Sequence, residues 1–61
     1  MADSAKLEEL INHHDRLMRE CLERAYSARY YGNYDLASRK EEEAENHERM
    51  MRHYQSLLET V

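Results

Sequence analysis

The chain has 61 residues, a formal net charge of −4 and a single cysteine, Cys21. A chain of this length forms one small domain, so we expect residues 1–61 to be a single unit that needs a disulfide, a metal or a partner to be stable. One cysteine excludes a disulfide within the chain, and a lone thiol is typical of a reducing, cytoplasmic compartment.

The sequence shows neither a signal peptide nor a membrane-spanning segment. Residues 1–6 lack a basic start followed by an apolar run. No segment approaches the roughly 20 apolar residues that a membrane-spanning helix needs. We therefore expect a cytoplasmic protein with no membrane partner.

The first half of the chain has the pattern of a long amphipathic helix. The sequence contains no proline and one glycine, Gly32, and both residues are disfavoured inside helices. Asp3 and Ser4 are suitable N-cap residues. Gly32 and Asn33 tolerate the left-handed conformation that ends helices, so the pattern predicts a helix over about 4–31. Its inward stripe is Leu7, His14, Cys21 and Ala28, flanked by Leu10, Leu17, Arg24 and Tyr31 and by Ile11, Met18 and Ala25.

The second half predicts another helix, over about 34–60. Asn33 is a suitable cap, and Asp35 places negative charge in the first turn, where the helix dipole favours it. Because the turn is short, the two helices must run antiparallel as neighbours. Residues whose numbers add to about 65 then lie at the same level. This register pairs Cys21 with Ala44, His14 with Met51, Ala28 with Ala37, Leu7 with Leu58 and Arg24 with Glu41.

We therefore predict an all-α fold, an antiparallel two-helix hairpin that dimerises into a four-helix bundle. On each helix the apolar face covers three positions in seven, whereas one neighbouring helix covers two. A second copy of the chain is the simplest source of the missing cover, since twofold dimers are the commonest oligomers. A different protein partner and a marginally stable monomer are the alternatives.

The candidate interface combines the edges of this apolar face with a tyrosine-rich segment around the turn. Aromatic residues with a polar tip are enriched at interfaces. The tyrosine cluster either widens the dimer interface or binds another protein. The ten candidate residues are Leu10, Ile11, Met18, Leu22, Tyr26, Tyr30, Tyr34, Leu36, Met50 and Leu57.

The candidate metal ligands are His14, Cys21 and His47. With nearby methionines they fall in the middle of the predicted bundle, and thiol and imidazole groups suit copper or zinc. The chain lacks Cys-x-x-Cys and His-x-x-x-His spacings, so ordinary packing is the competing interpretation. Buried imidazoles at His14 and His47 would also weaken assembly at mildly acidic pH.

The sequence favours a non-enzymatic function. It contains no nucleotide-binding loop and no nucleophile beside a base in a recognisable motif, and it implies no cofactor. Glutamates interspersed among the arginines argue against a nucleic-acid partner. We therefore expect a small protein-interaction or adaptor module that acts as a homodimer. The alternative is a small copper- or zinc-binding helical bundle.

Overall fold

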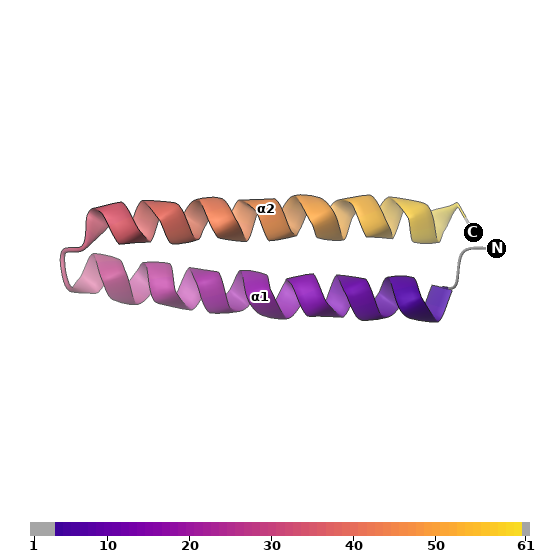
Figure 1. The fold of residues 1–61 in the computed structure, drawn as a ribbon, viewed down its shortest axis with the longest axis horizontal. Helices are drawn as coiled ribbons and strands as arrows, with labels where there is room; N and C mark the ends of the chain where they lie inside the picture. The colour runs from indigo at the N-terminus through magenta and orange to yellow at the C-terminus, as the bar shows by residue number, and fades with distance from the viewer. Residues whose placement is uncertain (1–3, 61) are drawn as a thin grey trace.

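The computed structural model describes residues 4–60, which form two α-helices, α1 (Ser4–Tyr30) and α2 (Tyr34–Glu59). The helices lie side by side and antiparallel along their whole length, so the start of α1 and the end of α2 lie at one end of the hairpin (Figure 1). The predicted all-α hairpin is confirmed, and each helix ends one residue before its predicted limit. The predicted cap residue Asp3 lies outside the described residues.

The turn combines the end of α1 with the start of α2 in very few residues. The Gly32 N–H donates to the Arg29 carbonyl at 3.0 Å, and the Asn33 N–H donates to the Ala28 carbonyl at 2.7 Å. These two bonds form a Schellman motif, which requires a left-handed residue; Gly32 supplies it with φ +80°. The Asn33 side chain then accepts a hydrogen bond from the Leu36 N–H at 3.3 Å and caps α2.

The core between the helices is made mainly of alanine. Four alanines, one cysteine and one leucine are its buried residues, and none of the described residues with a large side chain is completely buried. Small side chains let two helices approach closely, but each one removes little apolar surface from water. Three members of the predicted inward stripe, Leu7, Cys21 and Ala28, are confirmed as buried, and so are Ala37 and Ala44, the residues that the register paired with Ala28 and Cys21. The buried residues are Leu7, Cys21, Ala25, Ala28, Ala37 and Ala44.

The hairpin is long and thin. Its extents are 48 × 13 × 11 Å and its radius of gyration is 14.0 Å, whereas a compact chain of this length has a radius of about 10.5 Å. Its accessible surface is 4903 Å², against about 4,200 Å² for a compact protein of the same mass. The two helices therefore leave apolar surface that a globular fold would bury.

The predicted pairing of Arg24 with Glu41 is wrong. Glu41 instead accepts a hydrogen bond from Arg29 Nε at 2.8 Å, and Arg24 is exposed on the other side of the hairpin, where it lines a groove with Lys40. The register predicts which residues lie at the same height along the two helices. It does not predict on which side of the buried seam each side chain lies. Arg24 and Glu41 flank the buried stripe on opposite sides, so their side chains cannot meet.

Tyr31 was also expected on the inward stripe, and its side chain is 82% exposed. The physical reason is its position one residue beyond the end of α1, where the chain has begun to turn and α2 has not yet started. Tyr31 contacts the ring of Tyr30 edge-on at 5.1 Å instead.

The turn predicts a specific effect of replacing Gly32. A Cβ at this position would meet nothing within 4 Å, so Gly32→Ala carries only the conformational cost of a positive φ, about 1–2 kcal/mol. Urea unfolding at fixed protein concentration should show that loss of stability. Gly32→Asn should lose less, because asparagine tolerates the left-handed region. Equal stability of Gly32→Ala and the unaltered chain would contradict this account of the turn.

Candidate functional site

The hairpin has two long faces, one on each side of the buried alanine seam. On one side a groove near the turn brings Arg24 of α1 and Tyr31 of the turn together with Leu36 and Lys40 of α2. Residues seven positions apart lie on the same face of a helix. On α2 this face continues away from the turn through Glu43 and then through uncharged residues, and on α1 it continues through two leucines. We call its six uncharged residues the histidine face: Leu10, Leu17, His47, Met50, Tyr54 and Leu57.

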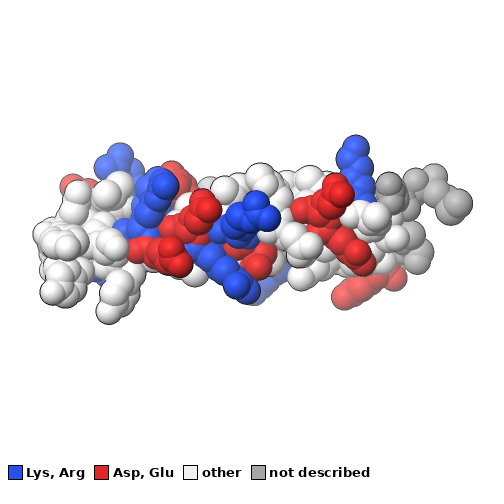
Figure 2. Space-filling view, turned by 90° about the horizontal axis from the view of Figure 1, so that it is seen from below, with Lys and Arg blue, Asp and Glu red and all other residues white. Residues whose placement is uncertain are grey.

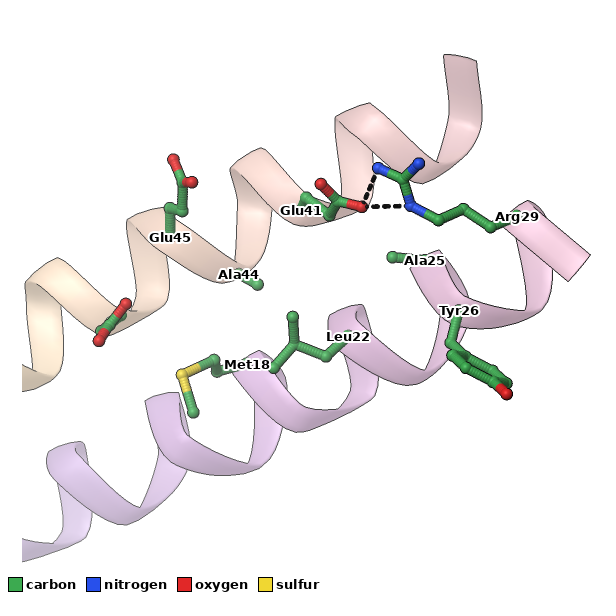
Figure 3. Close-up of a pocket in the computed structure, with 9 residues that line it drawn as sticks. Met18, Leu22, Ala25, Tyr26, Arg29, Glu41, Ala44 and Glu45 are labelled. Atoms are coloured by element: carbon green, nitrogen blue, oxygen red, sulfur yellow. Dashed lines mark hydrogen bonds and ion pairs between the residues drawn. The ribbon is translucent and has the colours of Figure 1, made fainter. Parts of the chain in front are cut away.

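The opposite side, the groove face, holds a second groove between the helices. It is lined from α1 by Met18, Leu22, Ala25, Tyr26 and Arg29 and from α2 by Glu41, Ala44, Glu45 and Glu48 (Figure 3). The two faces differ in chemistry. The side with the histidine face carries Arg24, Lys40 and Glu43 near the turn, and the six residues of the histidine face itself are uncharged. The α2 side of the second groove carries three glutamates along its length.

The structure divides the ten predicted interface residues among three surfaces. The histidine-face side receives four of them: Leu10, Leu36, Met50 and Leu57. The groove face receives Ile11, Met18 and Leu22, since Ile11 lies seven positions before Met18. Tyr26 lines the turn end of the groove face, and Tyr30 and Tyr34 lie exposed near the turn. The role of these ten residues in an interface stays a prediction.

At the middle of the seam the imidazoles of His14 and His47 face each other. Their Nδ1 atoms are 2.8 Å apart, a hydrogen-bond distance at which one nitrogen must carry the proton and the other must accept it. Both side chains are half-buried. The Tyr54 ring stacks on His14 at 5.8 Å, and the His13 ring meets it edge-on at 5.3 Å. The bond requires at least one neutral imidazole.

The surroundings of His14 favour its neutral form. Its partial burial lowers its pKa below the ordinary value of 6.5, and the nearby imidazoles of His47 and His13 lower that pKa further. Glu43 lies one turn before His47 on α2 and interacts with it electrostatically. Its pKa is lowered, mainly by the hydrogen bond from Lys40 at 3.1 Å, so Glu43 stays charged through mildly acidic pH.

The sequence paired His14 with Met51, and the structure corrects this by one helical turn. The inferred register placed residues correctly to within a few positions along the helices. The register does not predict the conformation of a side chain, so it could not show that the His14 imidazole contacts a residue one helical turn away from Met51. A histidine on each inward face, near the middle of each helix, was the available signal for this pair.

Cys21 is not part of the histidine pair, and its thiol bonds to a carboxylate. Its buried Sγ donates to Glu43 Oε2 at 3.5 Å. Burial raises the pKa of the Cys21 thiol, and the hydrogen bond to Glu43 raises it further, so the thiol stays protonated near neutral pH. Metals bind the thiolate form. Over residues 4–60 no three His, Cys, Asp or Glu side chains converge as a metal site would require.

The turn end of the hairpin presents a cluster of exposed tyrosines. Tyr26, Tyr30, Tyr31 and Tyr34 have side chains that are 62–82% exposed. Seen from the α1 side, this end of the molecule is largely free of charged side chains, whereas positive and negative side chains alternate over the middle (Figure 2). The alternation leaves no extended basic patch on this side of the molecule.

Comparison of the chain with protein-family models, with curated proteins and with solved structures found no match. Within the described helices, no segment is both long enough and apolar enough to cross a bilayer.

The histidine pair predicts that the fold loses stability as the pH falls from 7.5 to 5.5. The pKa of His14 is lower in the folded state than in the unfolded state, so the unfolded chain binds more protons below about pH 6.5. The loss should begin near pH 6.5 and end below the folded pKa. Thermal unfolding at the two pH values measures it.

His14→Gln should make the melting temperature less sensitive to pH, because glutamine does not titrate. His53→Gln is the control, since His53 is an exposed histidine two turns from His47 on the same helix. The interpretation fails if the control removes the pH dependence as completely as His14→Gln does.

Proposed function

We propose that this chain is a small non-enzymatic protein-interaction module that works as a homodimer. In the proposed dimer two hairpins pack their histidine faces together into a four-helix bundle. The observation that carries the proposal is the histidine face itself. It is an apolar strip on both helices beyond the alanine seam, with Met50 still 38% and Leu57 41% exposed.

The size of the face supports this assembly. The hairpin is 48 Å long, and two adjacent helices with their side chains are about 20 Å wide. One face therefore offers on the order of 1,000 Å², and a standard specific interface uses about 800 Å² from each partner. Covering this face would bury the apolar area that the alanine seam leaves exposed.

The chemistry of the face supports a second copy as the occupant. In a twofold dimer the same surface meets itself, so it must be self-complementary. Leu10, Leu17, Met50 and Leu57 satisfy this condition without requiring charges of opposite sign. The groove face would not, because its glutamates would meet identical glutamates when paired with itself.

The dimer would also seal the histidine pair. His47 belongs to the histidine face and bonds to His14 beneath it, so a second hairpin on this face would exclude water from both imidazoles. Burial of an imidazole opposes its protonation. This supports the expectation that mildly acidic pH weakens association, in addition to its effect on the single hairpin. The free, protonated Cys21 thiol supports a cytoplasmic location.

Two matched leucine substitutions test the proposed interface. Leu57 and Leu22 are 41% and 47% exposed, on the histidine face and the groove face respectively. Leu57→Glu should raise the dimer dissociation constant at least tenfold, because it places an unpaired charge in an apolar interface. Leu22→Glu should leave it within about twofold. Analytical ultracentrifugation measures both, with circular dichroism to confirm that the helices persist.

A monomeric unaltered chain at high micromolar concentration would refute the homodimer. Equal weakening by Leu57→Glu and Leu22→Glu would refute the choice of face. The first result tests whether the chain dimerises, and the second tests which face forms the dimer.

A metal-binding bundle is the alternative, favoured by the convergence of the two Nδ1 atoms of His14 and His47. Two imidazoles fall short of the four ligands typical of a closed zinc site. A second copy would have to supply the others. Native mass spectrometry with added Zn²⁺ or Cu²⁺ tests this: one ion per dimer, lost in the His14→Gln variant, would support the alternative.

A further inference from the structure

The groove face contains an open groove that the proposed dimer would leave uncovered. It has a volume of about 380 Å³ and runs between the helices from Met18 to Arg29 on α1. That stretch covers about 16 Å at the rise of an α-helix, or three helical turns. The groove exists because its floor, formed by Ala25 and Ala44, consists of buried residues with minimal side chains.

The α1 wall of the groove is apolar. Met18 and Leu22 line the α1 side of the groove, and Leu22 extends toward α2, whereas the ring of Tyr26 points away from α2 (Figure 3). Leu22 is 47% exposed and Tyr26 is 75% exposed. A thioether, a branched aliphatic chain and an aromatic ring together suit an apolar row on a partner helix, since Met adapts its shape and Tyr contributes a large contact area.

The α2 wall is acidic. Glu41, Glu45 and Glu48 line it, and Arg29 is the one basic residue that lines the groove. Arg29 hydrogen-bonds to Glu41, and Arg52 binds Glu48 from outside the groove at 2.9 Å. Among the described residues Glu45 makes no ion pair. With Arg29 and Arg52 both counted against the three glutamates, the groove carries a net charge of −1, and Glu45 is the carboxylate that supplies it.

We infer that this groove binds a basic amphipathic helix of another protein, whose apolar row contacts Met18 and Leu22 while a Lys or Arg side chain of that helix pairs with Glu45. Helix-in-groove binding with apolar anchors at helical spacing is a common mode of peptide recognition. An acidic wall attracts a basic helix and rejects acidic ones. The inference deepens the proposed interaction function by naming a class of partner.

Charge argues against a second copy of this chain in the groove. Helix α2 carries four basic and seven acidic residues, and the described part of α1 carries five of each. Neither helix is net basic, so neither complements the acidic wall. The histidine face does not require charge complementarity, which is why we assign the second copy to it and the basic helix to the groove.

The test uses a synthetic, fluorescein-labelled helical peptide of about 14 residues. It carries leucine at positions i, i+4, i+7 and i+11, with arginine beside them on one flank. Fluorescence anisotropy with the full chain should give a dissociation constant in the micromolar range that rises with salt. A matched peptide with glutamate in place of arginine should not bind detectably.

Matched variants of the chain locate the binding site. Glu45→Gln should weaken arginine-peptide binding about threefold, and Leu22→Ala about tenfold. Glu42→Gln removes the same charge from the outward side of α2 and should change the affinity by less than 1.5-fold. Absence of binding by the arginine peptide would overturn the inference, and so would equal affinity of the Glu45→Gln and Glu42→Gln variants.

The groove and the dimer can fail separately. Leu57→Glu should dissociate the dimer without weakening binding of the arginine peptide. Leu22→Ala should weaken binding of that peptide without dissociating the dimer. If Leu22→Ala instead dissociates the dimer, a second copy occupies the groove and the inference is wrong. If the chain is monomeric and still binds the arginine peptide, the groove inference stands without the dimer.

Discussion

The close approach of two long helices over a seam of alanines determines most of what this molecule can do. Ala25, Ala28, Ala37 and Ala44 let the helices pack closely, and that proximity fixes which side chains flank the seam on each side. The same alanines bury little apolar area, about one methyl group each. Larger side chains in the seam would have stabilised the single hairpin more and left its faces less apolar.

The two faces divide the remaining polar and apolar residues unequally. On the histidine face both helices contribute apolar side chains, which suits a partner with the same surface. On the groove face α1 contributes apolar residues and α2 contributes carboxylates, which suits a partner of different composition. In the proposed assembly the hairpin holds a copy of itself on one face and a second protein on the other, which is the arrangement expected of an adaptor.

The sequence was sufficient for the fold and insufficient for the site. Gly32, Asn33 and the seven-residue repeat predicted both helices and the turn, because these signals act locally along the chain. The side on which each flanking residue lies depends on how two antiparallel helices face each other, and Arg24 shows the resulting error. The His14–His47 bond depends in addition on side-chain conformation, which a repeat pattern does not encode. The dimer stays a prediction.

The turn has a consequence for how this hairpin can vary. The backbone N–H of Asn33 caps the end of α1, and its side chain caps the start of α2. The connection therefore contains no residue that is free of both helix ends. One inserted residue that lengthened α2 at its start would rotate the rest of that helix by about 100°. The histidines would then separate, the carboxylates would leave the groove, and both binding surfaces would be lost together. The number of residues in the turn therefore matters for the two faces as much as the identity of any residue on them.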